Sequence, residues 1–109
     1  MAGGIHGSTN LSLRSQMVRA AMSIPANIVE GSSQDSRREF GRFLGYAANS
    51  ATELEYHLML ARDIGAIGLN DFTALVGRTV EVRKMLRGLQ KRVATGGLNA
   101  AKPTAGRAR

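Results

Sequence analysis

Three residues near the middle of the chain, Glu53, Glu55 and His57, form the one cluster whose side chains resemble a metal or acid–base site. A di-iron helical bundle needs a Glu-x-x-His pattern on two helices. Here His57 follows Glu53 by four residues, and the sequence offers no second half of such a site. Residues four apart share one helix face, so the spacing favours a simple Glu53–His57 contact. We therefore expect no metal and no cofactor.

Other candidates for catalysis lack partners in the sequence. His6 lies in a Gly-rich start with no evident partner, and Ser23 and Ser50 have no adjacent base. A glycine-rich phosphate loop would have to follow a strand, and no strand is expected here. Nothing forms a set of nucleophile, base and orienting group. The sequence predicts that the protein is not an enzyme.

The strongest functional feature is a concentration of positive charge at the end of the chain. The formal net charge is +7, and no acidic residue follows Glu81. Such a cluster favours a polyanionic partner, RNA or DNA. No aromatic residues lie between the basic ones, so binding should be electrostatic and weakly sequence-specific. The predicted nucleic-acid-binding residues are Arg83, Lys84, Arg87, Lys91, Arg92, Lys102, Arg107 and Arg109.

An ordinary structural role for these cations is the alternative. Basic residues near a helix C-terminus interact favourably with the helix dipole, and a charged solvent-facing side of a helix is common. A second, smaller basic group, Arg37, Arg38 and Arg42, can similarly be a solvated first helical turn.

Length and composition limit the class of protein. The chain has 109 residues, which is the size of one domain, and no cysteine, which excludes disulfides and thiolate metal sites. No apolar run approaches the ~18 residues needed to cross a bilayer. The first ten residues contain no apolar signal-peptide core, so we expect a cytoplasmic protein that does not enter a membrane. With only two prolines and many Ala and Leu residues, helix is favoured over sheet.

The elements that must position these residues are helices. Residues 1–10 read as a flexible, Gly-rich tail. Apolar residues three and four apart then predict a helix over about 12–29, in which Pro25 should cause a kink or a short break and Gly31 should end the helix.

Two further helices show heptad spacing. Ser36 and Glu39 form a capping box that begins the second helix, and Gly65 ends it. The third helix begins near Gly68 or Asn70 and stops at Gly96-Gly97. The apolar seams that pair these two helices are Phe40, Leu44, Ala47, Ala51, Leu54, Leu58 and Ala61 in one, and Phe72, Leu75, Thr79, Val82, Leu86, Leu89 and Val93 in the other.

The predicted fold is all-α, an antiparallel up-and-down helical bundle with three long helices. The bundle domain spans 11–96, and 97–109 should be a disordered basic tail. The second helix also carries a small-residue face, Gly41, Gly45 and Ala48, where another backbone should come close. Either a tight contact within the chain or a subunit interface would explain that face.

A stretch of the first helix resembles a known family. Residues 16–31, QMVRAAMSIPANIVEG, resemble the pattern (Q)xRRAxxSIPxNIxEG of a bacterial four-helix-bundle family encoded in intervening sequences of large-subunit ribosomal RNA genes. Further matching segments follow in order up to about residue 93: Glu39-Phe40 with Phe43-Leu44, Glu53-Leu54-Glu55, Leu60-Ala61-Arg62-Asp63-Ile64-Gly65, and Val82-Arg83-Lys84-Met85-Leu86 with Gly88-Leu89. The chain is also similar to the accessory variability determinant of diversity-generating retroelements.

The resemblance implies a four-helix bundle that assembles into a ring-like homo-oligomer, a pentamer, and a basic surface that binds nucleic acid. It also implies a long helix ahead of residue 11, for which this sequence has only ten Gly-rich residues. A bundle without that helix would expose an apolar groove, which a partner or self-association could fill. The residues that carry the family pattern, to which we assign a structural role, are Ser23, Pro25, Asn27, Glu30, Gly31, Arg62 and Asp63.

Three of these assignments are specific. Ser23 and Asn27 can satisfy backbone groups that Pro25 leaves free, and Glu30 could pair with Arg62. For the whole protein, two functions remain open. The first is an oligomeric nucleic-acid-binding accessory module that acts through its basic C-terminal helix face and tail. The second is a scaffold bundle that docks a protein partner or self-associates without nucleic acid.

Overall fold

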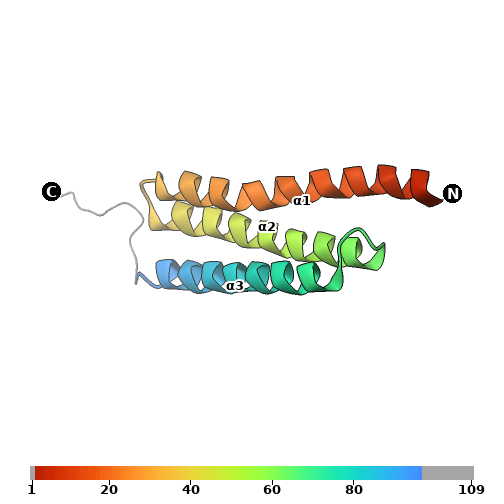
Figure 1. The fold of residues 1–109 in the computed structure, drawn as a ribbon. Coiled ribbons are helices and arrows are strands. Elements are labelled where there is room, and N and C mark those ends of the chain that lie inside the picture. The colour runs from red at the N-terminus through yellow and green to blue at the C-terminus, as the bar shows by residue number, and fades with distance from the viewer. Residues whose placement is uncertain (1, 97–109) are drawn as a thin grey trace.

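The computed structural model describes the backbone of residues 2–96 and the side chains of residues 11–96. This part of the chain is all-α, without strands, and forms an antiparallel bundle of the helices α1 (Ala2–Ser32), α2 (Arg37–Asp63) and α3 (Leu69–Ala94). Figure 1 shows α2 between the other two, with α1 extending past the turn that joins α2 to α3. None of the described helices is sufficiently long and apolar to cross a bilayer.

Helix α2 organises the packing. It contacts both α1 and α3, whereas no Cα atom of α1 lies within 8 Å of one in α3 across the described residues. The core nevertheless joins all three helices, because side chains of α1 and α3 meet over the small residues of α2. Its buried members are Leu44, Ala47, Ala48, Leu86 and Val93, with Ile24, Ile28, Phe40 and Leu89 packed against them.

The start of α1 differs from the sequence prediction. Residues 2–10, which we expected to be a flexible tail, belong to the helix. No proline interrupts this segment, and extending an existing helix adds one hydrogen bond for each residue fixed, which is much easier than nucleating a new helix. Residues 97–109, the predicted basic tail, lie outside the described residues.

The other end of α1 also differs. The helix continues through Pro25, so the short break is not present, and it ends at Ser32, one residue beyond the expected stop. Gly31 is buried inside the helix. A Cβ atom built on Gly31 would lie 2.8 Å from the Cβ of Phe43 and 3.1 Å from Cδ1 of Phe40. This glycine therefore allows α1 and α2 to approach closely.

The bounds of α2 and α3 agree with the sequence prediction. Ser36 caps α2 by accepting a hydrogen bond from the Glu39 backbone N–H at 3.1 Å. Gly65, with φ +75°, and Gly96, with φ +83°, follow the ends of α2 and α3. Both glycines adopt the left-handed conformation that closes a helix end without strain.

The predicted burial of the heptad seams is found in full in α2 and only in part in α3. Every seam residue of α2 is buried or half-buried. In α3, however, Leu75 and Val82 are exposed. The prediction of burial is wrong for these two residues. The backbone of α3 comes close only to that of α2 in the described residues, so one side of the α3 seam has no neighbouring helix to cover it.

The small-residue face of α2 is a contact within the chain. A Cβ on Gly45 would lie 2.6 Å from Nε2 of Gln90, and one on Gly41 would lie 3.8 Å from Cγ1 of Val93. Both neighbours belong to α3. The structure thus supports the intrachain alternative for Gly41, Gly45 and Ala48.

Candidate nucleic-acid interface

The antiparallel arrangement brings together two basic groups that are far apart in sequence. The first turn of α2 lies beside the last turns of α3, and polar contacts fix this register. Gln90 Nε2 donates to the Gly41 carbonyl oxygen at 3.1 Å, and Arg87 Nη2 donates to Asn49 Oδ1 at 2.8 Å. Arg37 lies over the end of α3, since a Cβ on Gly96 would come within 2.6 Å of its Nη1 atom.

A hollow of about 430 Å³ opens between these two helix ends. We call the hollow and the cations beside it, Arg37, Arg38, Arg87 and Lys91, the basic end of the bundle. Helix α2 begins here and α3 ends here, so the positive N-terminal dipole of α2 is opposed by the negative C-terminal dipole of α3, and the positive potential comes from the side chains. The hollow is lined by Arg37, Arg38, Gly41, Arg42, Gln90, Val93 and Ala94.

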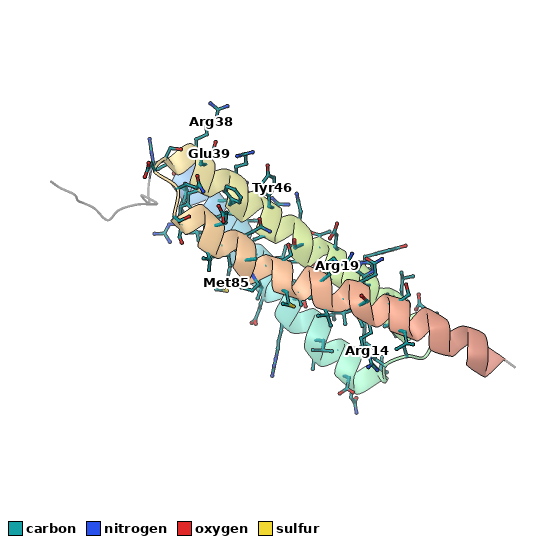
Figure 2. All side chains as sticks on the ribbon, turned by 90° about the horizontal axis from the view of Figure 1, so that it is seen from above. Arg14, Arg19, Arg38, Glu39, Tyr46 and Met85 are labelled. Carbon is teal, nitrogen blue, oxygen red and sulfur yellow. The ribbon has the colours of Figure 1, made fainter. Side chains whose placement is uncertain are left out.

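The arginines of the hollow differ in how far their charge is compensated. Arg42 forms an ion pair with Glu39 and contacts the Tyr46 hydroxyl. The hydrogen bond to the Glu39 carboxylate, and then its charge, raise the pKa of Arg42 above its ordinary value. Within the described part of the chain, Arg37 and Arg38 form no ion pair. Figure 2 shows Arg38 pointing away from the bundle, so its charge is available to a ligand.

Arg83 does not belong to the basic end, although the sequence predicts it as a nucleic-acid contact. Its Nε atom donates to Oε2 of Glu55 on α2, and both side chains are partly buried. The pair ties α3 to α2. The positive charge of Arg83 is therefore balanced by the carboxylate of Glu55, which belongs to a different helix.

The remaining predicted cations lie on different sides of α3. Lys84 and Lys91 are exposed, and at about 100° per residue they lie on the side of α3 away from α2. Lys91 follows Gln90 and is level with the hollow, but it does not line it. Arg92 lines a separate apolar hollow together with Ile28 of α1 and Met85. The predicted residues Lys102, Arg107 and Arg109 lie outside the described residues.

The sequence therefore identifies most cations but not their grouping. In the sequence, Arg37 and Arg38 form a separate, smaller basic group. No nearby residue indicates that this group lies beside the cations at the end of α3. Asn49 and Gln90, which orient the two helix ends, are not predicted at all. The small-residue pattern at Gly41 and Gly45 is the signal that could have located the Gln90 contact, because it marks where α3 comes close.

No metal site is found where the structure can be described. In residues 11–96, no group of three His, Cys, Asp or Glu side chains could hold a metal ion. The Nδ1 atom of His57 is buried and has no hydrogen-bond partner among these residues, and the contact between Glu53 and His57 stays a prediction.

Two of the family-pattern residues form a polar link between α1 and α2. The hydroxyl groups of Ser23 and Ser50 lie 2.7 Å apart. Asn27 Nδ2 donates to the Ser23 carbonyl oxygen at 2.9 Å and to Ser23 Oγ at 3.0 Å. Pro25 lacks the N–H that would bond to the carbonyl of Ala21. Asn27 thus satisfies a carbonyl in the same turn, but not the one that the proline leaves free.

The expected pair between Glu30 and Arg62 is not formed. Glu30 lies near the end of α1 and Arg62 near the end of α2, at opposite ends of an antiparallel pair. Arg62 instead bonds to Asp63 and stacks on Phe72, with its guanidinium carbon 4.5 Å from the ring centroid. Both contacts stabilise the turn between α2 and α3, which is a structural role.

Comparison with known proteins gives one match. The family model described as 23S rRNA-intervening sequence protein matches residues 4–88. Searches of curated proteins and of solved structures find no match to this chain. The matched region includes Arg37, Arg38 and Arg87 and ends before Lys91, so it covers most of the basic end. Because the match extends over more than half of the chain, the protein belongs to the 23S rRNA-intervening sequence protein family.

Proposed function

We propose that this protein is a non-enzymatic accessory module that binds the phosphate backbone of a nucleic acid through its basic end. The observation that carries the proposal is the hollow of about 430 Å³ bordered by Arg37, Arg38 and Arg42 at the N-terminus of α2. Guanidinium groups form paired hydrogen bonds with phosphate oxygens.

The balance of charge supports the same function. Arg87 and Lys91 extend the positive surface along α3, and the three cations of residues 97–109 follow in sequence. Glu39 is paired with Arg42, so this carboxylate does not offset the charge of Arg37 or Arg38. Contacts of this kind neutralise phosphates without reading base edges, and they give strong but weakly sequence-specific binding.

The test compares exposed cations inside and outside the basic end. We expect Arg38→Gln and Lys91→Gln each to weaken binding to labelled RNA and DNA duplexes several-fold at low salt. Arg78→Gln is the control, because Arg78 is also an exposed helical arginine but lies near the start of α3, far from the basic end. Equal binding by all variants would overturn the proposal.

RNA and DNA are both needed in this test. The family name refers to an intervening sequence of 23S rRNA, which identifies neither nucleic acid as the ligand. A phosphate contact is common to the two, whereas groove shape and the 2′-hydroxyl differ. The cytoplasmic location and the pentamer that the resemblance implies stay predictions.

A further inference from the structure

Tyr46 is an exposed aromatic residue next to the basic end. It follows Arg38 and Arg42 on α2 at intervals of four residues, and it is 41% exposed. Figure 2 shows Arg38 and Tyr46 in succession along this helix. The cations of α3 have no aromatic residue among them, whereas those at the start of α2 do. The fold therefore adds an aromatic ring to the cations that meet at this end of the bundle.

Contacts on several sides hold the Tyr46 ring in place. Its hydroxyl oxygen accepts a hydrogen bond from Nη1 of Arg42 at 3.0 Å. The half-buried Phe43 meets the ring edge to face, with the two ring centroids 5.4 Å apart. The guanidinium carbon of Arg42 lies 5.6 Å from the centroid of the Tyr46 ring. A ring fixed in this way loses little further conformational freedom when a ligand packs on it.

Arg42 connects the hollow of the basic end to this ring. It lines the hollow, and the same guanidinium group donates to the Tyr46 hydroxyl. Glu39 balances its charge and fixes its orientation, because Nε of Arg42 donates to Oε1 of Glu39 at 3.0 Å. An exposed ion pair of this kind contributes little to folding stability. Its effect at this surface is to position Tyr46 beside the phosphate-binding cations.

Cations lie on both sides of Tyr46 along α2. Arg38 precedes it by eight residues, which is about 12 Å of helix. Arg87 of α3 reaches α2 one turn beyond Tyr46, because its Nη2 atom donates to Oδ1 of Asn49 at 2.8 Å. At about 100° per residue, Arg38, Tyr46 and Asn49 fall within an arc of roughly 80°. A strand whose phosphates contact Arg38 and Arg87 would therefore pass beside the ring.

Exposed rings set among cations are typical of sites for single-stranded nucleic acid, whose bases stack on the rings. In a duplex, neighbouring bases cover each other's faces, and a base must leave the stack before it can pack on a side chain. We propose that the basic end binds single-stranded nucleic acid, with one unpaired base stacked on Tyr46. This inference rests on the proposed function and names the form of nucleic acid that the site takes. Every base has a flat face, so stacking adds affinity without requiring a particular sequence.

Tyr56 provides a matched control on the same helix. It is 56% exposed, which is more than Tyr46. No lysine or arginine of α2 lies within four residues of Tyr56, and Glu53 and Glu55 do. A carboxylate repels a phosphate group, so an exposed ring at this position should not take part in binding.

The first test compares a labelled single strand of mixed sequence with a blunt duplex of the same length, at one salt concentration. Tyr46→Leu should weaken binding of the single strand at least about fivefold, because one stacking ring is lost. Binding of the duplex should stay within about twofold of wild type. Tyr46→Phe keeps the ring and should retain most of the affinity for the single strand. Tyr56→Leu should leave binding of both ligands unchanged.

The outcomes separate stacking from the phosphate contacts. Equal losses of affinity for both ligands in Tyr46→Leu would give the ring a purely structural role and overturn the inference. Unchanged affinity for the single strand in this variant would also overturn it, and the phosphate contacts would stand. If the wild-type chain bound neither ligand at low salt, the proposed function itself would fail. Circular dichroism of each variant distinguishes loss of binding from loss of helix.

The second test observes the ring directly by fluorescence. The chain has two tyrosines and no tryptophan, so Tyr56→Phe leaves Tyr46 as the one emitting tyrosine. A stacked base quenches this emission, so a single strand should lower it, whereas a sugar–phosphate strand without bases should bind and leave it unchanged. Tyr46→Phe controls for absorption by the nucleic acid, because its remaining tyrosine lies away from the basic end. Equal quenching in the two variants would contradict stacking on Tyr46.

Discussion

At the scale of single residues, the missing Cβ of Gly31 sets the distance between α1 and α2. The sequence marks Gly31 as a helix end, because glycine is common just past a helix C-terminus. The close neighbours of Gly31 are Phe40 and Phe43 on the next helix. A sequence pattern cannot show this contact, since it depends on how α1 crosses α2.

The substitution Gly31→Ala should therefore destabilise the protein. The new Cβ would lie 2.8 Å from the Cβ of Phe43, which cannot move without its backbone. We expect the free energy of unfolding to fall by about 1–3 kcal/mol in urea denaturation. Gly77→Ala is the control, because no atom lies within 4 Å of its added Cβ, and it should raise the free energy of unfolding by up to about 1 kcal/mol. Equal effects of both substitutions would contradict this account of Gly31.

Arg83 is a second residue whose charge is evident from the sequence but whose contact with another helix is not. Basic residues late in the chain are visible in the sequence, but the carboxylate that Arg83 meets belongs to α2. Only the register between α2 and α3 brings Glu55 to it. The sequence therefore predicts which residues are cations, but not which of them are free of an ion pair and able to bind a ligand.

This pairing gives Arg83→Gln an effect unlike that of Arg38→Gln. Loss of the ion pair with Glu55 should lower the free energy of unfolding by about 1 kcal/mol, because both side chains are partly buried. Affinity for a nucleic-acid duplex should stay within about twofold of wild type, since the charge is already neutralised. A large loss of affinity with unchanged stability would return Arg83 to the interface.

At the scale of elements, α2 could be predicted almost completely and α1 only in part. The start of α2 is fixed by a local side-chain cap, its end by a glycine with positive φ, and its buried face by a heptad pattern. All three are properties of adjacent residues. The first described residues of α1 form a Gly-rich segment whose composition favours a tail, so the sequence does not predict that the helix includes residues 2–10.

The cap of α2 can be tested directly. Ser36→Ala removes the oxygen that accepts from the Glu39 N–H, and we expect it to lower the free energy of unfolding by about 1 kcal/mol. Ser12→Ala, at an exposed position inside α1, should change stability by only a few tenths of a kcal/mol. Thermal unfolding followed by circular dichroism compares the two. If Ser36→Ala were as stable as wild type, water or another group would have to satisfy the first turn of α2.

At the scale of the whole molecule, the three helices place charge and apolar surface in different regions. The basic end lies where α2 begins and α3 finishes, whereas a shallow hollow with the exposed apolar residues Leu11, Val18 and Met22 lies on α1. Figure 2 labels Arg38 at the basic end, and Arg14 and Arg19 on α1. The sequence predicts the helices that create this division, but not which cations gather at one end.

The central claim is that cations of the basic end replace counterions on a phosphate backbone. The most direct measurement is the dependence of duplex binding on salt, from about 50 to 300 mM, for wild type and for the double variant Arg38→Gln with Lys91→Gln. The account predicts that the logarithm of the binding constant falls linearly with the logarithm of the salt concentration. It also predicts that the slope becomes shallower by about two in the double variant and stays unchanged in Arg78→Gln. A flat salt dependence, or the same slope in all three proteins, would contradict it.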